Sequence, residues 1–201
     1  MSVKLKICGM KHNIAEVSTL LPDYMGFIFY DKSPRNFIDS PPKLPLSIKR
    51  VGVFVDATLE DISEKIRTFQ LDVVQLHGDE SPEFCQSLFG VEIWKVFSIR
   101  DSFDFNRLAP YETAVDKFLF DTKGKEKGGN GFTFDWDVLK NYPLTKPFIL
   151  SGGIGLGELD SLQQILKTEL PIYAIDVNSK FEHSPGLKNT KQLAQFMRHC
   201  E

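Results

Sequence analysis

The sequence predicts an α/β fold: a single-domain (β/α)₈ (TIM) barrel with eight parallel strands. Apolar, strand-like runs recur about every 20 to 30 residues, the length that a strand, a helix and two short loops require. There are eight such runs, and they are nearly continuously apolar, which is typical of parallel strands buried on both faces. A doubly wound open sheet is the alternative, because 201 residues are few for an eight-stranded barrel.

The predicted strands follow one another along the whole chain. Each is a short apolar run between segments rich in polar, glycine or proline residues. In chain order they are "VKLKIC" from Val3, "YMGFIFY" from Tyr24, "RVGVFV" from Arg50, "DVVQLH" from Asp72, "EIWKVFSI" from Glu92, "KFLFD" from Lys117, "PFILSGG" from Pro147 and "IYAIDV" from Ile172. We therefore expect one domain over residues 1–201.

Caps and apolar stripes predict helices in several of the connections. Asn13 with Glu16 is predicted to begin one helix, Thr58 a second and Ser81 a third, and an apolar stripe at 159–166 indicates a fourth. The connections "DSPPKLPLSIK" and "DSFDFNRLAPY" are proline-rich or short, so we expect irregular structure there. Strict alternation of strand and helix implies right-handed crossovers and a parallel sheet covered by helices.

Composition excludes several classes of function. The formal net charge is -3 without a block of like charges, so nucleic acid is not an expected partner. Cys8, Cys85 and Cys200 are odd in number and form no C-x-x-C pair, which argues against a disulfide framework and a metal cluster. No apolar run approaches the roughly 18 residues of a membrane span, and no secretory signal is recognisable. We expect a cytoplasmic protein that has no membrane partner.

Polar residues at the predicted strand ends are the candidates for chemistry, because (β/α)₈ barrels carry their active sites at the carboxyl ends of the strands. We expect these residues to face one mouth of the barrel. They are Cys8, Arg35, His77, Asp121, Gly152, Gly153, Asp176, Asn178 and Ser179.

Cys8 and Asp121 are the candidates for proton transfer. A thiol supplies some thiolate near neutral pH and can accept a proton from carbon where its surroundings favour the anion. Taken alone, a cysteine at this position is more often an inert core residue. A carboxyl group at the end of an apolar strand suits a general acid, because partial burial favours its protonated form. The alternative for Asp121 is a turn residue that starts a glycine-rich loop.

Two glycine-containing loops predict a phosphate site. Gly152 and Gly153 follow the seventh strand, where unhindered backbone N–H groups can approach a phosphate. Asn178 and Ser179 follow the eighth strand and add backbone donors, with Asp176 just before them. Glycine turns after strands are common, but in eight-stranded barrels the loops after strands seven and eight are the usual phosphate cradle. A phosphorylated small molecule is therefore the expected ligand.

Three further features have a functional and a plain structural interpretation. The planar guanidinium of Arg35 can bind a carboxylate with two hydrogen bonds, or it is a surface arginine in a turn. His77 is a candidate for substrate binding or for orienting a neighbour, or it makes only local hydrogen bonds. The lysine- and glycine-rich segment 123–131 is a candidate lid or a solvated loop.

Several motifs, in this order and spacing, resemble those of the phosphoribosylanthranilate isomerase family of tryptophan biosynthesis, from the first strand to the last helix. They are "KICGM" from Lys6, "GFIFYDKSPRNF" from Gly26, "VGVFVD" from Val51, "VQLHGDE" from Val74, "FLFDT" from Phe118, "GGNGFTFDW" from Gly128, "LSGGI" from Leu150 and "IDVNSKFEHSPGLKN" from Ile175. The resemblance implies a ribulose-phosphate-binding barrel that performs an Amadori rearrangement without a cofactor or metal. It converts N-(5'-phosphoribosyl)anthranilate to 1-(2-carboxyphenylamino)-1-deoxyribulose 5-phosphate.

The resemblance also implies roles for residues. Cys8 would be the general base, Asp121 the general acid, and Arg35 would meet the anthranilate carboxylate. The alternatives are another sugar-phosphate isomerase or epimerase, or a phosphometabolite-binding barrel without catalysis. A related histidine-pathway isomerase typically has an aspartate where this chain has Cys8. The sequence leaves the assembly open between a monomer and a homodimer.

Overall fold

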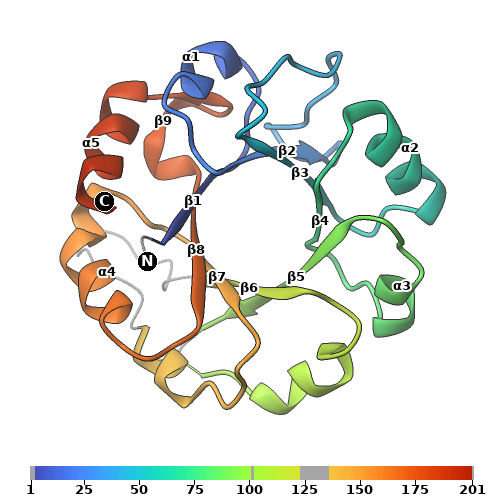
Figure 1. Cartoon of the computed structure of the whole chain (residues 1–201), viewed down its shortest axis with the longest axis vertical. Helices are drawn as coiled ribbons and strands as arrows, with labels where there is room; N and C mark the ends of the chain where they lie inside the picture. Colours follow the sequence, from blue (N-terminus) through green and yellow to red (C-terminus); the bar gives the residue numbers. More distant parts are fainter. Residues whose placement is uncertain (1–2, 101, 123–135, 201) are drawn as a thin grey trace.

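The structure is a computed structural model that describes residues 3–100, 102–122 and 136–200. Eight parallel strands form a closed barrel in chain order, and β8 pairs with β1 to complete the ring. Figure 1 looks down this barrel, with the strands around the centre and the helices outside them. The predicted (β/α)₈ barrel is confirmed. The open sheet is wrong, because it would leave two edge strands where β1 and β8 are paired.

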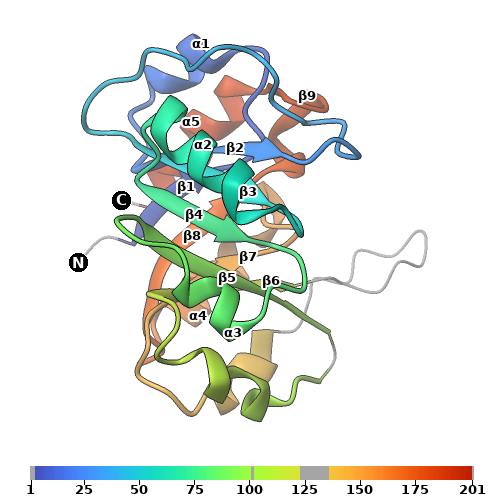
Figure 2. The same cartoon turned by 90° about the vertical axis from the view of Figure 1, so that its right-hand side faces the viewer.

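The strands match the predicted runs to within a few residues at each end. β1 ends at Ile7, so Cys8 is the first residue beyond it. The barrel strands are β1 Lys4–Ile7, β2 Tyr24–Phe29, β3 Lys49–Phe54, β4 Val73–Leu76, β5 Glu92–Ile99, β6 Lys117–Thr122, β7 Phe148–Ser151 and β8 Ile172–Val177. Two further strands, β9 Glu182–Ser184 and β10 Leu187–Lys188, form an antiparallel pair that the sequence analysis did not predict. Figure 2 shows β9 at the end of the barrel toward which the strand arrows point.

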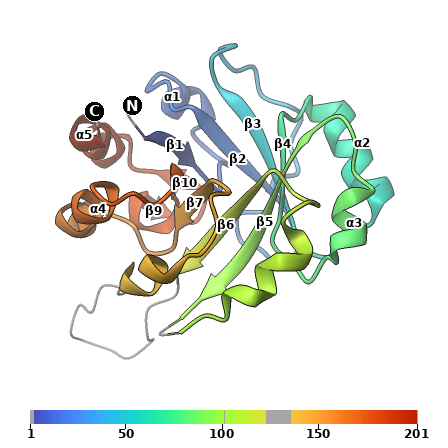
Figure 3. The ribbon, with the colours of Figure 1, turned by 60° about the horizontal axis from the view of Figure 1, so that its bottom comes forward.

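Among the described residues, the helices are fewer and shorter than an ideal barrel of this kind would have. The α-helices are α1 Ile14–Ser18, α2 Leu59–Phe69, α3 Pro82–Gln86, α4 Leu159–Leu166 and α5 Thr190–Cys200. The 3₁₀-helices are η1 Phe105–Tyr111, η2 Trp136–Asn141, η3 Leu156–Glu158 and η4 Ser179–Phe181. The connection between β2 and β3 contains no helix, and that between β5 and β6 contains only η1, as its composition predicted. Figure 3 shows α2 and α3 beside β3 and β4, and α4 and α5 on the opposite side of the barrel.

The capping predictions have different outcomes. The Thr58 side chain accepts a hydrogen bond from the Asp61 N–H, and that of Ser81 accepts one from the Phe84 N–H, so both predicted caps are confirmed. Asn13 precedes α1, but its side chain caps nothing, because its Oδ1 accepts the backbone N–H of Lys188 instead. The contact with β10 thus occupies the oxygen that a helix cap would use, while the Asn13 Nδ2 still donates to the Glu16 carboxylate at 2.9 Å.

The core has two parts. A small cluster fills the barrel interior with Tyr24, Val51, Val73, Trp94, Val96, Leu119, Ile149 and Ala174. A larger cluster lies between the strands and the surrounding segments. No helix among the described residues is long and apolar enough to cross a membrane. The inner cluster fills the barrel near the amino ends of the strands. The interior near the carboxyl ends is left for polar residues.

Candidate active site

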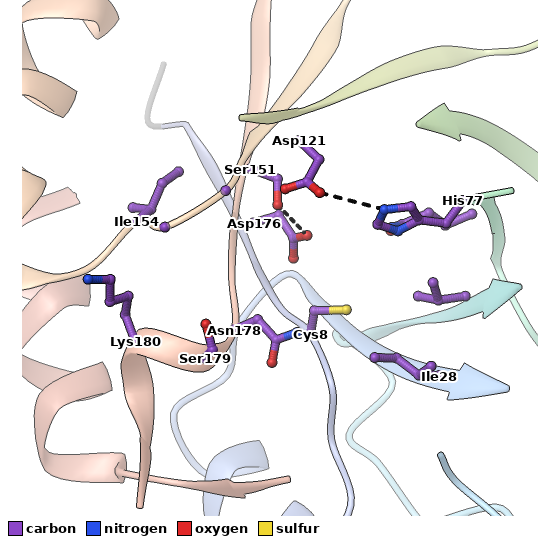
Figure 4. A pocket seen from close by; sticks show the side chains of 14 residues that line it. Cys8, Ile28, His77, Asp121, Ser151, Ile154, Asp176, Asn178, Ser179 and Lys180 are labelled. Carbon is purple, nitrogen blue, oxygen red and sulfur yellow. Dashed lines mark hydrogen bonds and ion pairs between the residues drawn. The ribbon is translucent and has the colours of Figure 1, made fainter. Parts of the chain in front are cut away.

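A cavity of about 180 Å³ lies at the carboxyl ends of the strands. Figure 4 shows side chains from several strands converging on it. It is lined by Cys8, Ile28, Val53, Gln75, His77, Asp121, Ser151, Gly152, Gly153, Ile154, Asp176, Asn178, Ser179 and Lys180. Every predicted site residue except Arg35 is among them. The predicted segment 123–131 lies outside the described residues.

Cys8 is held in place by the barrel itself. Its backbone N–H donates to the Val177 carbonyl at 2.8 Å, and Cys8 as a whole is only 4% exposed. A Cβ at Gly26, on the neighbouring strand β2, would lie 2.9 Å from the Cys8 sulfur, so glycine leaves the room that this thiol occupies. Burial raises the pKa of Cys8, and the nearby Lys6 opposes that effect. Cys8 is therefore a thiol whose acidity depends on its charged neighbours.

Asp121 lies near the end of β6 and faces His77, which follows β4. The His77 Nε2 and Asp121 Oδ2 atoms are 3.6 Å apart, and Figure 4 marks this contact with a dashed line. Both side chains are partly accessible from the cavity, at 34% and 17% exposure. This is a loose contact rather than a tight ion pair, so the carboxyl group is oriented but still open to a ligand.

Asp176 has protein partners for both of its oxygens. The fully buried Lys6 donates to Oδ1 at 2.9 Å, and the Ser151 hydroxyl donates to Oδ2 at 3.0 Å. Lys6 and Asp176 lie directly opposite each other in the register of β1 and β8. The predicted ligand-binding residue Asp176 is therefore also part of a buried polar chain in the cavity floor.

The predicted phosphate loops lie together at one side of the cavity. Gly152 and Gly153 have φ angles of +99° and +65°, the left-handed region that favours glycine. No atom lies within 4 Å of a Cβ placed at Gly153, so its backbone is open to a ligand. Ser179 and Lys180, from the loop after β8, line the same cavity. Lys180 adds a positive charge that the sequence analysis did not single out.

Arg35 lies beside the cavity rather than in its lining. Its Nε and Nη2 atoms donate to the Glu182 carboxylate at 2.6 to 3.0 Å. Glu182 also accepts Lys188 Nζ at 2.8 Å and the Gly186 N–H at 3.1 Å. Burial alone would raise the pKa of Glu182, but Arg35 and Lys188 hold it below its ordinary value. The arginine is thus fixed by an ionised carboxylate from β9.

Four polar residues around the cavity were not predicted from the sequence: Lys6, Gln75, Ser151 and Lys180. Lys6 and Gln75 each stand two positions before a predicted site residue, Cys8 and His77, so the two-residue period of a strand could have found them. Gln75 is 2% exposed, and its Oε1 has no hydrogen-bond partner among the described residues. An unsatisfied buried acceptor is costly, and functional sites are one place where proteins retain it.

Comparisons with known proteins agree with this geometry. The model of the N-(5'-phosphoribosyl)anthranilate (PRA) isomerase family matches residues 5–199. An N-(5'-phosphoribosyl)anthranilate isomerase from Parabacteroides distasonis is 43% identical over 96% of this chain and 91% of its own length.

Solved structures give the same result. Phosphoribosyl anthranilate isomerase from Thermotoga maritima superposes with a TM-score of 0.82 at 32% identity, over 98% of both chains. A phosphoribosyl anthranilate isomerase in complex with reduced 1-(o-carboxyphenylamino)-1-deoxyribulose 5-phosphate superposes with a TM-score of 0.81 at 29% identity, again over 98% of both. On this family match, and on relatives that cover nearly its whole length, the chain belongs to the N-(5'-phosphoribosyl)anthranilate isomerase family.

Proposed function

We propose that Cys8 and Asp121 carry out the two proton transfers by which this isomerase of tryptophan biosynthesis converts N-(5'-phosphoribosyl)anthranilate to 1-(2-carboxyphenylamino)-1-deoxyribulose 5-phosphate. The observation that carries the proposal is that the two side chains line one cavity from different strands. A substrate held between them meets an acid on one side and a thiol on the other. This arrangement suits an isomerisation in which one proton is delivered and another is removed.

Asp121 is the general acid. It protonates the furanose ring oxygen, the bond between that oxygen and C1' breaks, and the nitrogen lone pair forms an iminium ion. His77, 3.6 Å from the carboxylate, positions this group toward the cavity. A positioned acid contributes about 10²- to 10⁴-fold to the rate.

Cys8 is the general base. The positive charge of the iminium ion makes the proton on C2' acidic, and the thiolate removes it. The electron pair of the C–H bond forms the C1'–C2' double bond of an enolamine and neutralises the iminium nitrogen. Tautomerisation of the enolamine then gives the ketone.

The two ends of the substrate are bound by different groups. Gly152, Gly153, Ser179 and Lys180 supply backbone donors and a positive charge for the phosphate. Arg35 binds the anthranilate carboxylate. A guanidinium has five N–H donors, so its pairing with Glu182 leaves donors for a second carboxylate.

We further propose that residues 1–201 form one domain and that the enzyme works in the cytoplasm. Its partner is a small phosphorylated molecule. The assembly is a monomer or a homodimer. A phosphoribosylanthranilate isomerase from Thermotoga maritima is described as dimeric. Sedimentation at working concentration distinguishes the two states.

The test follows the loss of anthranilate-type fluorescence when purified protein meets freshly made substrate. We expect Cys8→Ser and Asp121→Asn each to lower kcat by about 10²- to 10⁴-fold with KM nearly unchanged. Cys85→Ser is the matched control, because Cys85 is buried on α3, away from the cavity, and its loss should leave kcat unchanged. Unchanged turnover in both site variants would contradict the assigned roles.

A further inference from the structure

Lys6 is an unusual residue for a barrel interior, because its side chain is fully buried and charged. Burying an ion costs several kcal/mol even after relaxation, and replacing a buried ion pair with apolar residues is often neutral or stabilising. Stability alone therefore does not account for the Lys6–Asp176 pair. A function in the adjoining cavity would account for it.

The strand geometry places the Lys6 side chain next to the Cys8 thiol. The two residues are two positions apart at the end of β1, so both point into the barrel. A Cβ built at Gly26 would lie 2.9 Å from the Cys8 sulfur and 3.1 Å from Lys6 Cε. The same space beside Gly26 is thus bordered by both side chains.

Asp176 fixes the ammonium group in this position. Lys6 Nζ is 2.9 Å from Asp176 Oδ1, and the Ser151 hydroxyl holds the other carboxylate oxygen at 3.0 Å. Burial alone would lower the pKa of Lys6, but Asp176 and Cys8 outweigh it and raise the pKa, so Lys6 is charged. The lysine cannot reach solvent without breaking this chain.

Other charged groups also surround Cys8. Lys188 on β10 and Arg35 in the β2–β3 connection interact with it electrostatically, but both are paired with Glu182 on β9. The titratable groups that line the rest of the cavity are His77, Asp121 and Lys180. Burial is the largest influence on the pKa of Cys8 and raises it, and Lys6 is the strongest influence that lowers it.

We propose that Lys6 is a positioning residue for the general base: its buried ammonium group, held by Asp176, stabilises the thiolate of Cys8 and sets the pH range in which the isomerase works. The proposal rests on the role of Cys8 proposed above. During the reaction the C2' proton moves to the Cys8 sulfur, while Lys6 stays protonated and transfers nothing. Its effect is on the balance between thiol and thiolate.

The experiment titrates the Cys8 thiolate by its ultraviolet absorbance in a Cys85→Ser, Cys200→Ser background, alongside the pH profile of kcat/KM. In Lys6→Met we expect the midpoint of thiolate formation to shift to higher pH by about one unit or more. The acidic limb of the kcat/KM profile should shift by the same amount. Lys4→Met is the matched control. Lys4 lies on the same strand and contacts Tyr173 at the other end of the barrel, so its loss should move neither.

A second variant separates electrostatics from a structural role. Asp176→Asn removes the negative charge that opposes the thiolate, so we expect the midpoint to fall where Lys6→Met raises it. A purely structural role of the pair would move both midpoints in the same direction. An unchanged midpoint in Lys6→Met overturns the proposal, and Lys6→Gln, which removes the same charge but keeps a donor for Asp176, decides it if Lys6→Met does not fold.

The thiolate titration needs no substrate, so it distinguishes the failure of this proposal from that of the proposed function. Retained turnover in Cys8→Ser would remove the catalytic role of the thiol. The shift of the Cys8 thiolate midpoint in Lys6→Met could still be measured in that case. If the midpoint did not shift, only the role proposed for Lys6 would fail.

Discussion

The two ends of the barrel are built from the same strands but differ in how their polar groups are paired. At the amino end, Lys4 donates to the Tyr173 hydroxyl at 2.9 Å, and the Tyr24 and Tyr173 hydroxyls are 2.7 Å apart. Trp94 Nε1 and Lys117 both bind the Glu92 carboxylate. These groups satisfy one another and close the barrel.

At the carboxyl end the pairing is incomplete. Gln75 Oε1 has no partner among the described residues, His77 and Asp121 make only a loose contact, and a cavity opens between them. Polar residues at the amino end bond to one another and stabilise the barrel. Among the described residues, some polar groups at the carboxyl end lack such close partners and are therefore available to a ligand. Substitutions at the two ends should therefore change different properties.

The largest effect on stability is expected at the amino end. Trp94 is fully buried and packs edge-on against Tyr24 with ring centroids 5.1 Å apart. Trp94→Ala should lower the free energy of unfolding by about 3–5 kcal/mol, because it leaves a cavity in the inner core. Urea unfolding measures this, and Trp94→Phe, which keeps most of the volume, should cost less. A large loss of kcat in folded Trp94→Ala would contradict the claim that the amino end contributes to stability and not to activity.

An intermediate effect, on activity alone, is expected beside the cavity. Arg35→Ala should raise KM by about tenfold to a hundredfold with kcat little changed, because carboxylate binding is present in both the ground and the transition state. Unfolding should change little, since Glu182 keeps Lys188 and the Gly186 N–H as partners. Steady-state kinetics test this, and a selective loss of kcat would rule out the binding role.

The smallest effect is a pH-dependent one at the amino end. Burial alone would raise the pKa of Glu92, but hydrogen bonds from Lys117 and Trp94 hold it below the ordinary value. A depressed pKa in the folded state stabilises the protein above the unfolded pKa of about 4.3, and this stability is lost as the pH falls through the folded pKa.

Glu92→Gln should therefore be less stable than the wild type at pH 7, by about 1 kcal/mol. The difference should shrink as the pH falls below about 4. Urea unfolding across this range measures the change, and kcat and KM at pH 7 should match the wild type. A stability difference that stays constant with pH would show that the ionised carboxylate is not its source.

Much of the fold and site could be predicted because strand periodicity is a local property. Apolar runs and their spacing predicted the eight strands, and the rule that barrel chemistry lies at the carboxyl ends identified Cys8, His77 and Asp121. Local side-chain caps at Thr58 and Ser81 were likewise predictable, because they involve residues only three positions apart.

Only the tertiary structure decided which distant groups meet. Barrel closure brings Asp176 opposite Lys6, and the pairing of β9 with β10 brings Glu182 and Lys188 beside Arg35. The Asn13 side chain likewise bonds to the backbone N–H and carbonyl of Lys188 on β10, and it does not cap α1. The sequence by itself determined the strands and the end of the barrel that carries the chemistry. The charge environment of Cys8 depends on contacts across about 170 positions in the chain, such as Lys6–Asp176, which no local pattern encodes.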